Sequence, residues 1–200
     1  MGQDPQRKRA AMVVGADVAL AIRGWPRAQV AVFVAGCAER MVQIFTVLHG
    51  GDPARNGDVD IVVQLMADLW DLRVPAGAFR GYVASLEGFR ELKASEEEVV
   101  RTAEVFSFYS VLVLRYSALY RAGADVEDAL RCAHVCLTAM GQLDQNLMGA
   151  GFASHEADSQ SRFVQLLSSG ELSVDFLSRI SAGNQAIGGQ RAAVICGWNR

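Results

Sequence analysis

The longest apolar pattern in the chain runs from Trp25 to Leu48 and predicts a buried helix. Apolar side chains recur there every three or four residues, which is the spacing of one helix face. The first half is apolar on its other faces as well, as is typical of a helix enclosed on several sides. Pro26 suits the first turn because its missing N–H would be unpaired there, and Gly50 and Gly51 favour an end. We expect this segment to be the central helix of a bundle.

A second long helix is predicted from about 95 to 122. Ser95 and Glu98 have the spacing of a capping box, in which the hydroxyl accepts an early backbone N–H and the acid reaches back to the cap. A wide apolar surface follows, and Gly123 favours an end. This segment is the expected second central helix.

Shorter amphipathic patterns on either side of these segments predict further helices. Asp58 and Asp125 are the predicted N-caps of two of them. Residues 149–158 are interpreted as a linker, and residues 192–196 as an extended tail packed on the bundle. The predicted shorter helices are 12–23, 58–73, 76–92, 125–147, a short one that carries Phe163 and ends at Gly170, and one that begins at Ser173.

No alternating pattern of strand type accompanies these helices. The predicted fold class is therefore all-α, a single-domain multi-helix bundle of about seven to eight helices with two long central helices. Residues 1–10 are predicted to be a disordered tail, and residues 11–200 to be the helical domain.

The charge and apolar content of the chain bear on whether it binds nucleic acid or membranes and on where in the cell it is found. The 200 residues carry a net charge of −3, and their one basic block is Arg7-Lys8-Arg9, so nucleic acid is not an expected partner. That block and the apolar residues 10–22 could belong to a secretory signal, but Asp17 within them favours an amphipathic helix. No apolar run approaches the length that spans a bilayer. We expect a cytoplasmic protein that does not bind membranes.

The cysteines and histidines do not predict a metal site. None of the four cysteines, at 37, 132, 136 and 196, forms a CxxC pair, so reduced and buried thiols are expected. Cys132 and Cys136 point away from His134, whereas zinc needs convergent ligands. His155-Glu156 lacks the second histidine of HExxH and is interpreted as a pair in a loop. No metal and no cofactor is therefore predicted.

Catalytic motifs are also missing from the sequence. It contains no GxSxG turn for a nucleophilic serine, no glycine-rich loop followed by GK[ST], and no strand followed by GxGxxG. We predict no catalytic residue, and the chain is expected not to be an enzyme.

The charged pair Glu39 and Arg40 on the central helix is the one candidate site. With Trp70 and Asp71 it could form a binding pocket between the second and third helices. Alternatively these charges form internal ion pairs, which are costly to break and often structural. The pairs considered are Arg115 with Glu39, and Arg40 with Asp68 or Asp71.

Several segments form a pattern through their order and spacing over roughly 25–190. They are Trp25 with AGCAERM at 35–41, LMADLWD at 65–71, AGADVEDAL at 122–130, FVQLLSSG at 163–170 and Ala186-Ile187-Gly188. Together these segments resemble the YjaG-like bacterial domain-of-unknown-function family. The chain departs from the family pattern at 42–45, where it has Val-Gln-Ile-Phe. The resemblance implies a compact all-helical fold and no particular activity.

Three functional hypotheses follow from these observations. The first is a non-catalytic interaction or accessory protein, a homodimer or the partner of another protein, because its wide apolar faces exceed what one bundle hides. The alternative is a small-ligand-binding protein or an enzyme that uses the charged pocket. The third and weakest is a regulatory helical module that senses a ligand.

Overall fold

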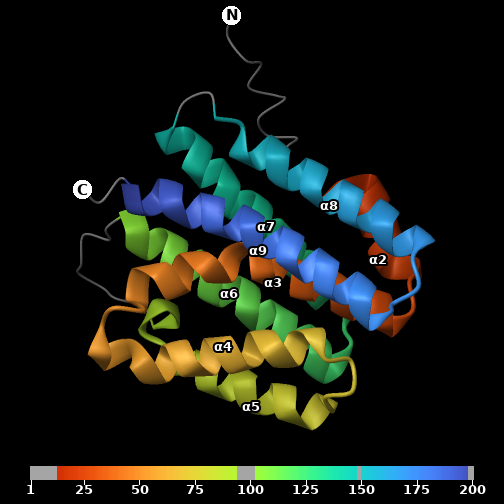
Figure 1. Cartoon of the computed structure of the whole chain (residues 1–200), viewed down its shortest axis with the longest axis horizontal. Coiled ribbons are helices and arrows are strands. Elements are labelled where there is room, and N and C mark those ends of the chain that lie inside the picture. The colour runs from red at the N-terminus through yellow and green to blue at the C-terminus, as the bar shows by residue number, and fades with distance from the viewer. Residues whose placement is uncertain (1–12, 94–101, 148–149, 198–200) are drawn as a thin grey trace, which may run out of the picture.

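The computed structural model describes residues 13–93, 102–147 and 150–197, and within these ranges the chain is all-α. They contain eight α-helices in one compact arrangement and no strand (Figure 1). The helices are α2 (Ala16–Gly24), α3 (Arg27–His49), α4 (Asn56–Trp70), α5 (Ala76–Glu87), α6 (Thr102–Gly123), α7 (Val126–Asn146), α8 (Phe152–Ser169) and α9 (Val174–Gly197), with short 3-10 turns at Pro53–Arg55 and Arg90–Leu92.

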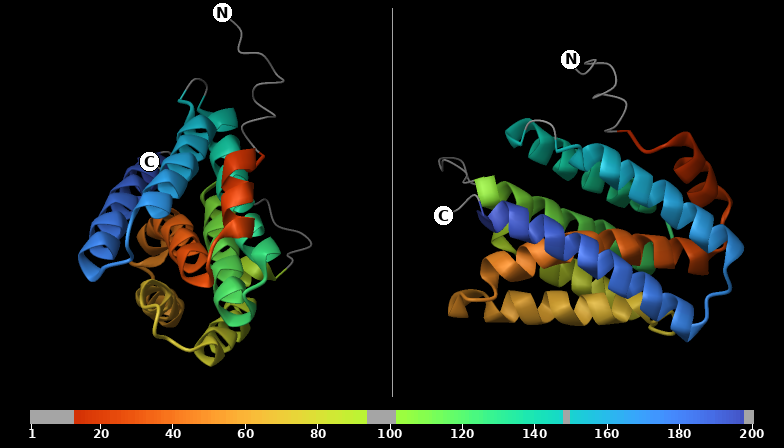
Figure 2. Two further views of the ribbon diagram at one scale, coloured as in Figure 1. Left: turned by 90° about the vertical axis from the view of Figure 1, so that its right-hand side faces the viewer. Right: turned by 45° about the horizontal axis from the view of Figure 1, so that its top comes forward.

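Helix α3 is the centre of the bundle, as its pattern predicted. Every residue from Val30 to Val42 is buried, and α3 contacts α4, α6, α7, α8 and α9 (Figures 1 and 2). Helix α6 is the second central helix and packs against α3, α5 and α7. Hydroxyl groups join the two helices, since Ser110 donates to the Met41 carbonyl at 3.0 Å and Ser117 to the Val34 carbonyl at 3.3 Å.

The same helix is long and apolar enough to cross a membrane. Its mean hydropathy is 1.6 over an 18-residue window, which corrects the expectation that no segment of the chain meets this criterion. Within the bundle, 83% of that window is buried. A membrane span and the core helix of a bundle can share the same length and apolar composition. In this structure the neighbouring helices bury α3, and a buried position in the core explains its apolar composition.

Two glycines allow α8 and α9 to approach α3 closely. A Cβ on Gly188 of α9 would lie 2.8 Å from the Glu39 carbonyl oxygen and 3.2 Å from that of Arg40. A Cβ on Gly36 of α3 would overlap the ring of Phe163 on α8. The three helices can therefore bring polar side chains together inside the bundle.

Two predictions for the C-terminal part were wrong. The linker predicted at 149–158 is largely the first part of α8, which begins at Phe152. Asp144 caps this start from α7 by accepting the N–H groups of Phe152 and Ala153 at 2.7 and 2.9 Å. The tail predicted to be extended at 192–196 belongs to α9, where packing against α3 outweighs the low helix propensity of its glycines.

Some of the predicted capping residues and helix ends agree with the structure and others do not. Asp125 caps α7 through the Glu127 N–H, as expected. Asp58 does not cap its helix, because α4 begins at Asn56 after a 3-10 turn that Asp52 caps instead. The helices predicted at 12–23 and 76–92 are shorter, with bounds Ala16–Gly24 and Ala76–Glu87. The capping box of Ser95 and Glu98 and the tail 1–10 lie outside the described residues.

Candidate functional site

The adjacent charges of α3 point to two different places. Consecutive helical residues diverge by about 100°, so Arg40 faces α8 and α9 while Glu39 faces the end of α4 and a different part of α9. We call the first place the closed centre, formed by Arg40, Glu156, Gln160, Asn184 and Arg191. The second is the groove, described below.

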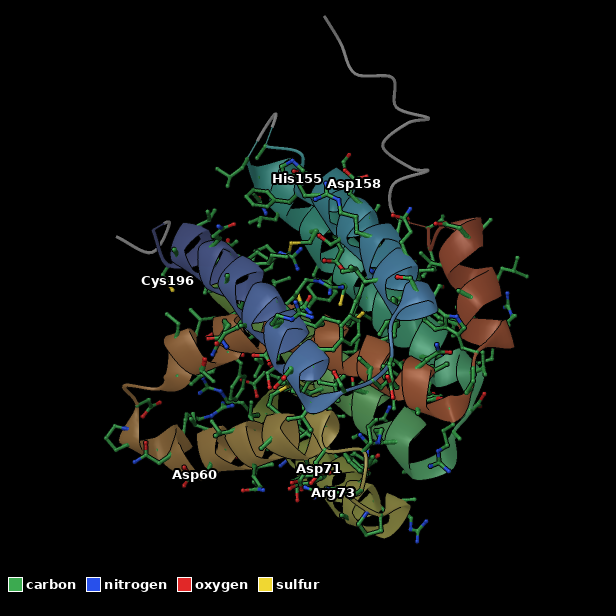
Figure 3. All side chains as sticks on the ribbon, turned by 45° about the vertical axis from the view of Figure 1, so that its right-hand side comes forward. Asp60, Asp71, Arg73, His155, Asp158 and Cys196 are labelled. Carbon is green, nitrogen blue, oxygen red and sulfur yellow. The ribbon has the colours of Figure 1, made fainter. Side chains whose placement is uncertain are left out.

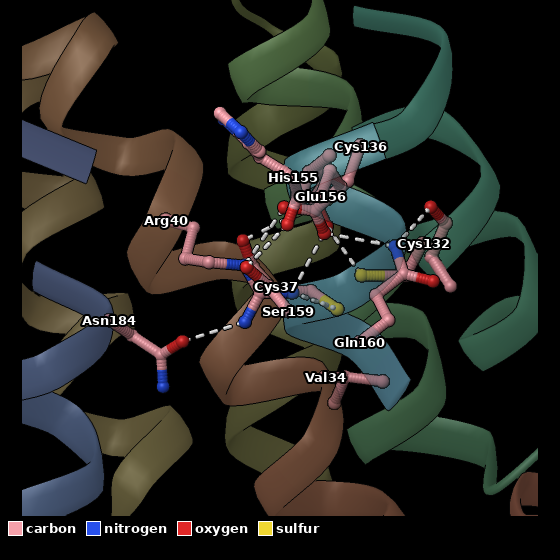
Figure 4. A network of polar contacts seen from close by, with 12 residues as sticks. Val34, Cys37, Arg40, Cys132, Cys136, His155, Glu156, Ser159, Gln160 and Asn184 are labelled. Carbon is pink, nitrogen blue, oxygen red and sulfur yellow. Dashed lines mark hydrogen bonds and ion pairs between the residues drawn. The ribbon is translucent and has the colours of Figure 1, made fainter. Parts of the chain in front are cut away.

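In the closed centre, two arginines bind one carboxylate. Arg40 donates to both Glu156 oxygens, from Nε at 3.0 Å and Nη2 at 2.8 Å (Figure 4). Arg191 Nη2 donates to Oε2 at 2.6 Å. Gln160 adds a 2.9 Å bond to Oε1, and Arg40 also donates to Asn184 Oδ1 at 2.6 Å. Arg40 and Glu156 have no solvent-exposed surface. This is a charge-assisted network sealed inside the bundle.

The charges in this network hold one another ionised. Burial by itself raises the pKa of Glu156, but the charges of Arg40 and Arg191 outweigh it and lower the pKa to about 2. Burial likewise disfavours the charged form of Arg40, and Glu156 more than offsets it, so the pKa of Arg40 is raised. Two buried polar atoms, Arg191 Nη1 and Gln160 Oε1, have no hydrogen-bond partner among the described residues.

Three thiols border the closed centre. The Cys37 sulfur accepts a 3.4 Å hydrogen bond from Arg40 Nη2, and the Cys136 thiol donates to the Cys37 carbonyl at 3.8 Å. Burial raises the pKa of the Cys37 thiol, but S–H donors from Cys132 and Cys136 and the Arg40 charge lower it well below its ordinary value. Cys37, Cys132 and Cys136 are buried and free of disulfides, as expected, whereas Cys196 is half-buried (Figure 3).

The groove lies between the end of α4 and the first half of α9 and has a volume of about 770 Å³. Directly behind its wall, the Glu39 carboxylate accepts the indole N–H of Trp70 at 2.8 Å and the hydroxyl of Ser181 at 3.5 Å. Asp71 and Arg73 form an ion pair at 2.9 Å in the lining (Figure 3). The groove is lined by Ala67, Trp70, Asp71, Leu72, Arg73, Leu172, Val174, Leu177, Ser178, Ser181, Ala182 and Gln185.

Glu39 differs from Glu156 in having only neutral partners in the described part of the chain: Trp70, Ser181 and, at 3.5 Å, Gln43. It is 7% exposed, and burial raises its pKa above the ordinary value of 4.5 because these donors do not fully replace water. By contrast, the hydrogen bonds of Arg73 lower the pKa of Asp71 to about 2. Glu39 is therefore a desolvated acid without a counter-ion among the residues that the structure describes.

The four predicted site residues are thus divided between the two places. Trp70 and Asp71 line the groove, Glu39 lies behind it, and Arg40 belongs to the closed centre. The groove is formed by α4 and α9, whereas the sequence placed it between the helices now labelled α3 and α4. The ion pairs considered as an alternative were wrong in their partners, although Arg40 is indeed in a buried pair. Arg115 pairs with Glu87 at 3.1 Å, Asp68 accepts the hydroxyl of Tyr82 at 2.6 Å, and Asp71 pairs with Arg73.

Sequence reasoning missed Glu156, Asn184 and Arg191. The interpretation of His155-Glu156 as a loop pair was wrong, since both residues lie in α8, where His155 is exposed and Glu156 is buried. A signal was present: Glu156, Gln160 and Phe163 have the spacing of one helix face. Asn184, Gly188 and Arg191 repeat this spacing on the buried face of α9.

A further buried cluster joins α3 and α6 to the two 3-10 turns. The His49 Nε2 atom lies 2.7 Å from the Ser107 hydroxyl and 3.3 Å from Glu91, and Arg55 binds both Glu91 oxygens at 2.8 Å. In a catalytic triad, one ring nitrogen of the histidine contacts the nucleophile and the other contacts the acid. Here the same nitrogen faces both partners, so the arrangement is that of an ion cluster that fastens the turns.

Comparisons of this chain with protein-family models, with curated proteins and with solved structures find no match. The resemblance to the YjaG-like family stays a prediction, and the function has to be argued from the geometry.

Proposed function

We propose that the chain is a non-catalytic binding protein whose site is the groove between α4 and α9, and that its ligand is a small organic cation such as an ammonium compound. The observation that carries this proposal is Glu39, a nearly buried carboxylate that has neutral partners alone within the described ranges and lies against the groove wall.

The charge of Glu39 favours a cation. Removing a carboxylate from water is costly unless an opposite charge compensates it. The nearest ion pair in the groove, between Asp71 and Arg73, is already neutral as a unit. Ionised Glu39 therefore leaves the groove with one negative charge that a bound cation would offset.

The groove wall offers contacts that suit an ammonium group. The indole N–H of Trp70 donates to Glu39, and Trp70 also lines the groove. A cation in the groove can therefore lie against the aromatic ring. Ser181 also gives its proton to Glu39, which leaves its oxygen free to accept from a ligand. Leu172 and Leu177 supply apolar surface for the remainder of the molecule. The volume of about 770 Å³ falls within the usual range for small-molecule sites.

The hypothesis of a protein partner or a homodimer has weaker support than the hypothesis of a small-molecule ligand, because of how the apolar side chains are distributed. That hypothesis depends on apolar faces beyond what one bundle hides, yet the apolar stripes of the central helices are enclosed. The large apolar side chains that are exposed in the described part lie on separate segments: Val13, Leu20, Val47, Val63, Phe108, Leu166 and Val174. Binding of a small molecule is the better supported form of the non-catalytic hypothesis, and a cytoplasmic location remains part of the proposal on the cysteine argument alone.

Thermal denaturation with a panel of matched compounds tests the proposal. The panel pairs primary and quaternary ammonium compounds with neutral and anionic molecules of the same shape. Cationic members should raise the Tm of the wild type, by an amount equivalent to about 2.7 kcal/mol at a hundred times Kd. They should do so more strongly as the pH rises through the raised pKa of Glu39, because the ionised form binds them.

Two variants separate the site from general charge effects. Glu39→Gln keeps an acceptor for Trp70 and Ser181 but removes the charge, so the cation-dependent rise in Tm should disappear. Glu87→Gln removes an exposed acid on α5 that pairs with Arg115, and it should leave the rise unchanged. Equal shifts with neutral or anionic compounds, or an undiminished shift in Glu39→Gln, would show that the proposal is wrong.

A further inference from the structure

Two cysteines from distant parts of the chain meet beside the closed centre. The Sγ atoms of Cys37 on α3 and Cys136 on α7, together with a carboxylate oxygen of Glu156, all lie within 4.8 Å of one another (Figure 4). All three side chains are buried. Sequence spacing alone does not reveal this convergence, because 99 residues separate the two cysteines.

The third group, Glu156, is not available as a metal ligand. Its two oxygens already accept hydrogen bonds from Arg40, Arg191 and Gln160 at 2.6–3.0 Å. The donor set of this group is therefore two sulfurs, and the Cys132 thiol lies outside it as a hydrogen-bond donor to Cys37. Structural zinc sites take four convergent ligands, and magnesium and calcium take oxygen, whereas thiolates select soft ions such as Cu(I).

The separation of the two sulfurs is compatible with a two-coordinate ion. With metal–sulfur bonds of about 2.3 Å, two sulfurs on opposite sides of an ion lie about 4.6 Å apart. This falls within the 4.8 Å bound on the Cys37 and Cys136 sulfurs. The Arg40 N–H that donates to the Cys37 sulfur at 3.4 Å would remain as a second hydrogen-bonded layer, of the kind that orients metal ligands.

The charge of the closed centre favours a monovalent ion. Arg40 and Arg191 face a single carboxylate, which leaves one excess positive charge for the thiols beside it to balance. Two thiolates with one monovalent cation carry one negative charge and neutralise the centre, whereas a divalent cation would restore the excess. The buried Arg191 Nη1, which has no hydrogen-bond partner in the described ranges, is an independent sign of incomplete compensation.

We propose that Cys37 and Cys136 form a buried site for one soft monovalent metal ion of the Cu(I) or Ag(I) class. Binding forms two metal–sulfur bonds, and any proton on either sulfur leaves to solvent without a change in oxidation state. The ion joins α3 to α7. Because both sulfurs are fully buried, uptake needs local opening of the bundle and is slow compared with binding at an exposed thiol.

Titration with Ag(I), which needs no reductant to hold its oxidation state, tests the proposal. The background is the Cys196→Ser variant, because Cys196 is the one half-buried thiol among the four and would bind the ion separately. One tightly bound ion per chain and a higher Tm are expected. Cys37→Ala or Cys136→Ala in this background should abolish both effects. Cys132→Ala is the matched control. It removes a buried thiol that donates to Cys37 but lies outside the group whose donor atoms converge, so the stoichiometry of one should be kept.

X-ray absorption of the Ag(I)-loaded or Cu(I)-loaded Cys196→Ser protein gives a readout that does not depend on whether the core variants fold. Two sulfur neighbours and no nitrogen or oxygen neighbour are expected. The absence of a bound ion would overturn the proposal, as would a coordination shell that includes oxygen. Equal stabilisation by zinc or cadmium would also overturn it, because a divalent ion does not neutralise the centre.

Discussion

The closed centre and the groove both depend on charges of α3 and on residues of α9, but they treat those charges in opposite ways. In the closed centre, Glu156 has two arginine partners and no exposed surface, so its pKa is lowered. At the groove, Glu39 has neutral donors and its pKa is raised. A charge that its own chain has already neutralised holds helices together. A charge left with neutral donors beside an open groove can still be neutralised by a ligand.

The largest loss in the free energy of unfolding is expected when Glu156 of the closed centre is replaced. Glu156→Gln leaves Arg40 and Arg191 buried without a negative partner, and removing one member of a buried ion pair typically costs about 3–5 kcal/mol. Urea denaturation of variant and wild type at neutral pH measures this loss. The exposed pair of Arg23 and Glu127 provides the control, because Glu127→Gln should cost at most about 1 kcal/mol.

The pH dependence of this loss identifies its origin. The pKa of Glu156 is lowered from 4.5 to about 2 in the native protein, so its contribution is fully present above pH 4.5 and is lost as the pH falls towards 2. The difference in stability between wild type and Glu156→Gln should therefore shrink over this interval. A cost as small as that of Glu127→Gln would show that the closed centre does not hold α3, α8 and α9 together.

A smaller loss of stability is expected from a substitution at Gly188, where α9 packs against the backbone of both Glu39 and Arg40. Gly188→Ala places a methyl group against the carbonyl oxygens of Glu39 and Arg40 and so pushes α9 away from α3. We expect a loss of about 1–3 kcal/mol by urea denaturation. Gly189→Ala is the matched control. A Cβ there would meet no described atom within 4 Å apart from its chain neighbours and the backbone of its own helix, and alanine favours a helix. Stability should therefore stay equal or rise by up to about 1 kcal/mol. Equal effects of both variants would contradict close packing at Gly188.

The fold could be predicted from the sequence because its signals are local. The period of apolar residues identified α3 and α6 as central helices, and Asp125 and Gly123 marked real helix ends. The errors arose where distant contacts decide. Asp144 caps α8 from the preceding helix, and packing on α3 carries α9 through its glycines, so a linker and a tail were predicted instead of helices.

The same distinction between local signals and distant contacts applies to the candidate site. Trp70 and Asp71 end the helix that packs beside α3, so their nearness to Glu39 could be inferred from order along the chain. The partner of Arg40 could not, because Glu156 lies 116 residues away, within the segment interpreted as a linker. Which of two adjacent charges is neutralised depends on that partner, and the partner is known only from the packing.

The smallest effect on stability, and the most informative about function, is expected for Glu39→Gln. An amide keeps an oxygen for the Trp70 N–H and removes the cost of a desolvated charge, so stability at pH 7 should be unchanged or higher by up to about 1 kcal/mol. The native pKa of Glu39 lies above the unfolded value, so its contribution to stability is present at low pH and is lost as the pH rises through the native pKa. Urea denaturation from pH 4 to 8 should show this decline in the wild type, relative to Glu39→Gln. A variant that is several kcal/mol less stable at pH 7 would mean that the carboxylate is as structural as Glu156, and the contrast between the two regions would not hold.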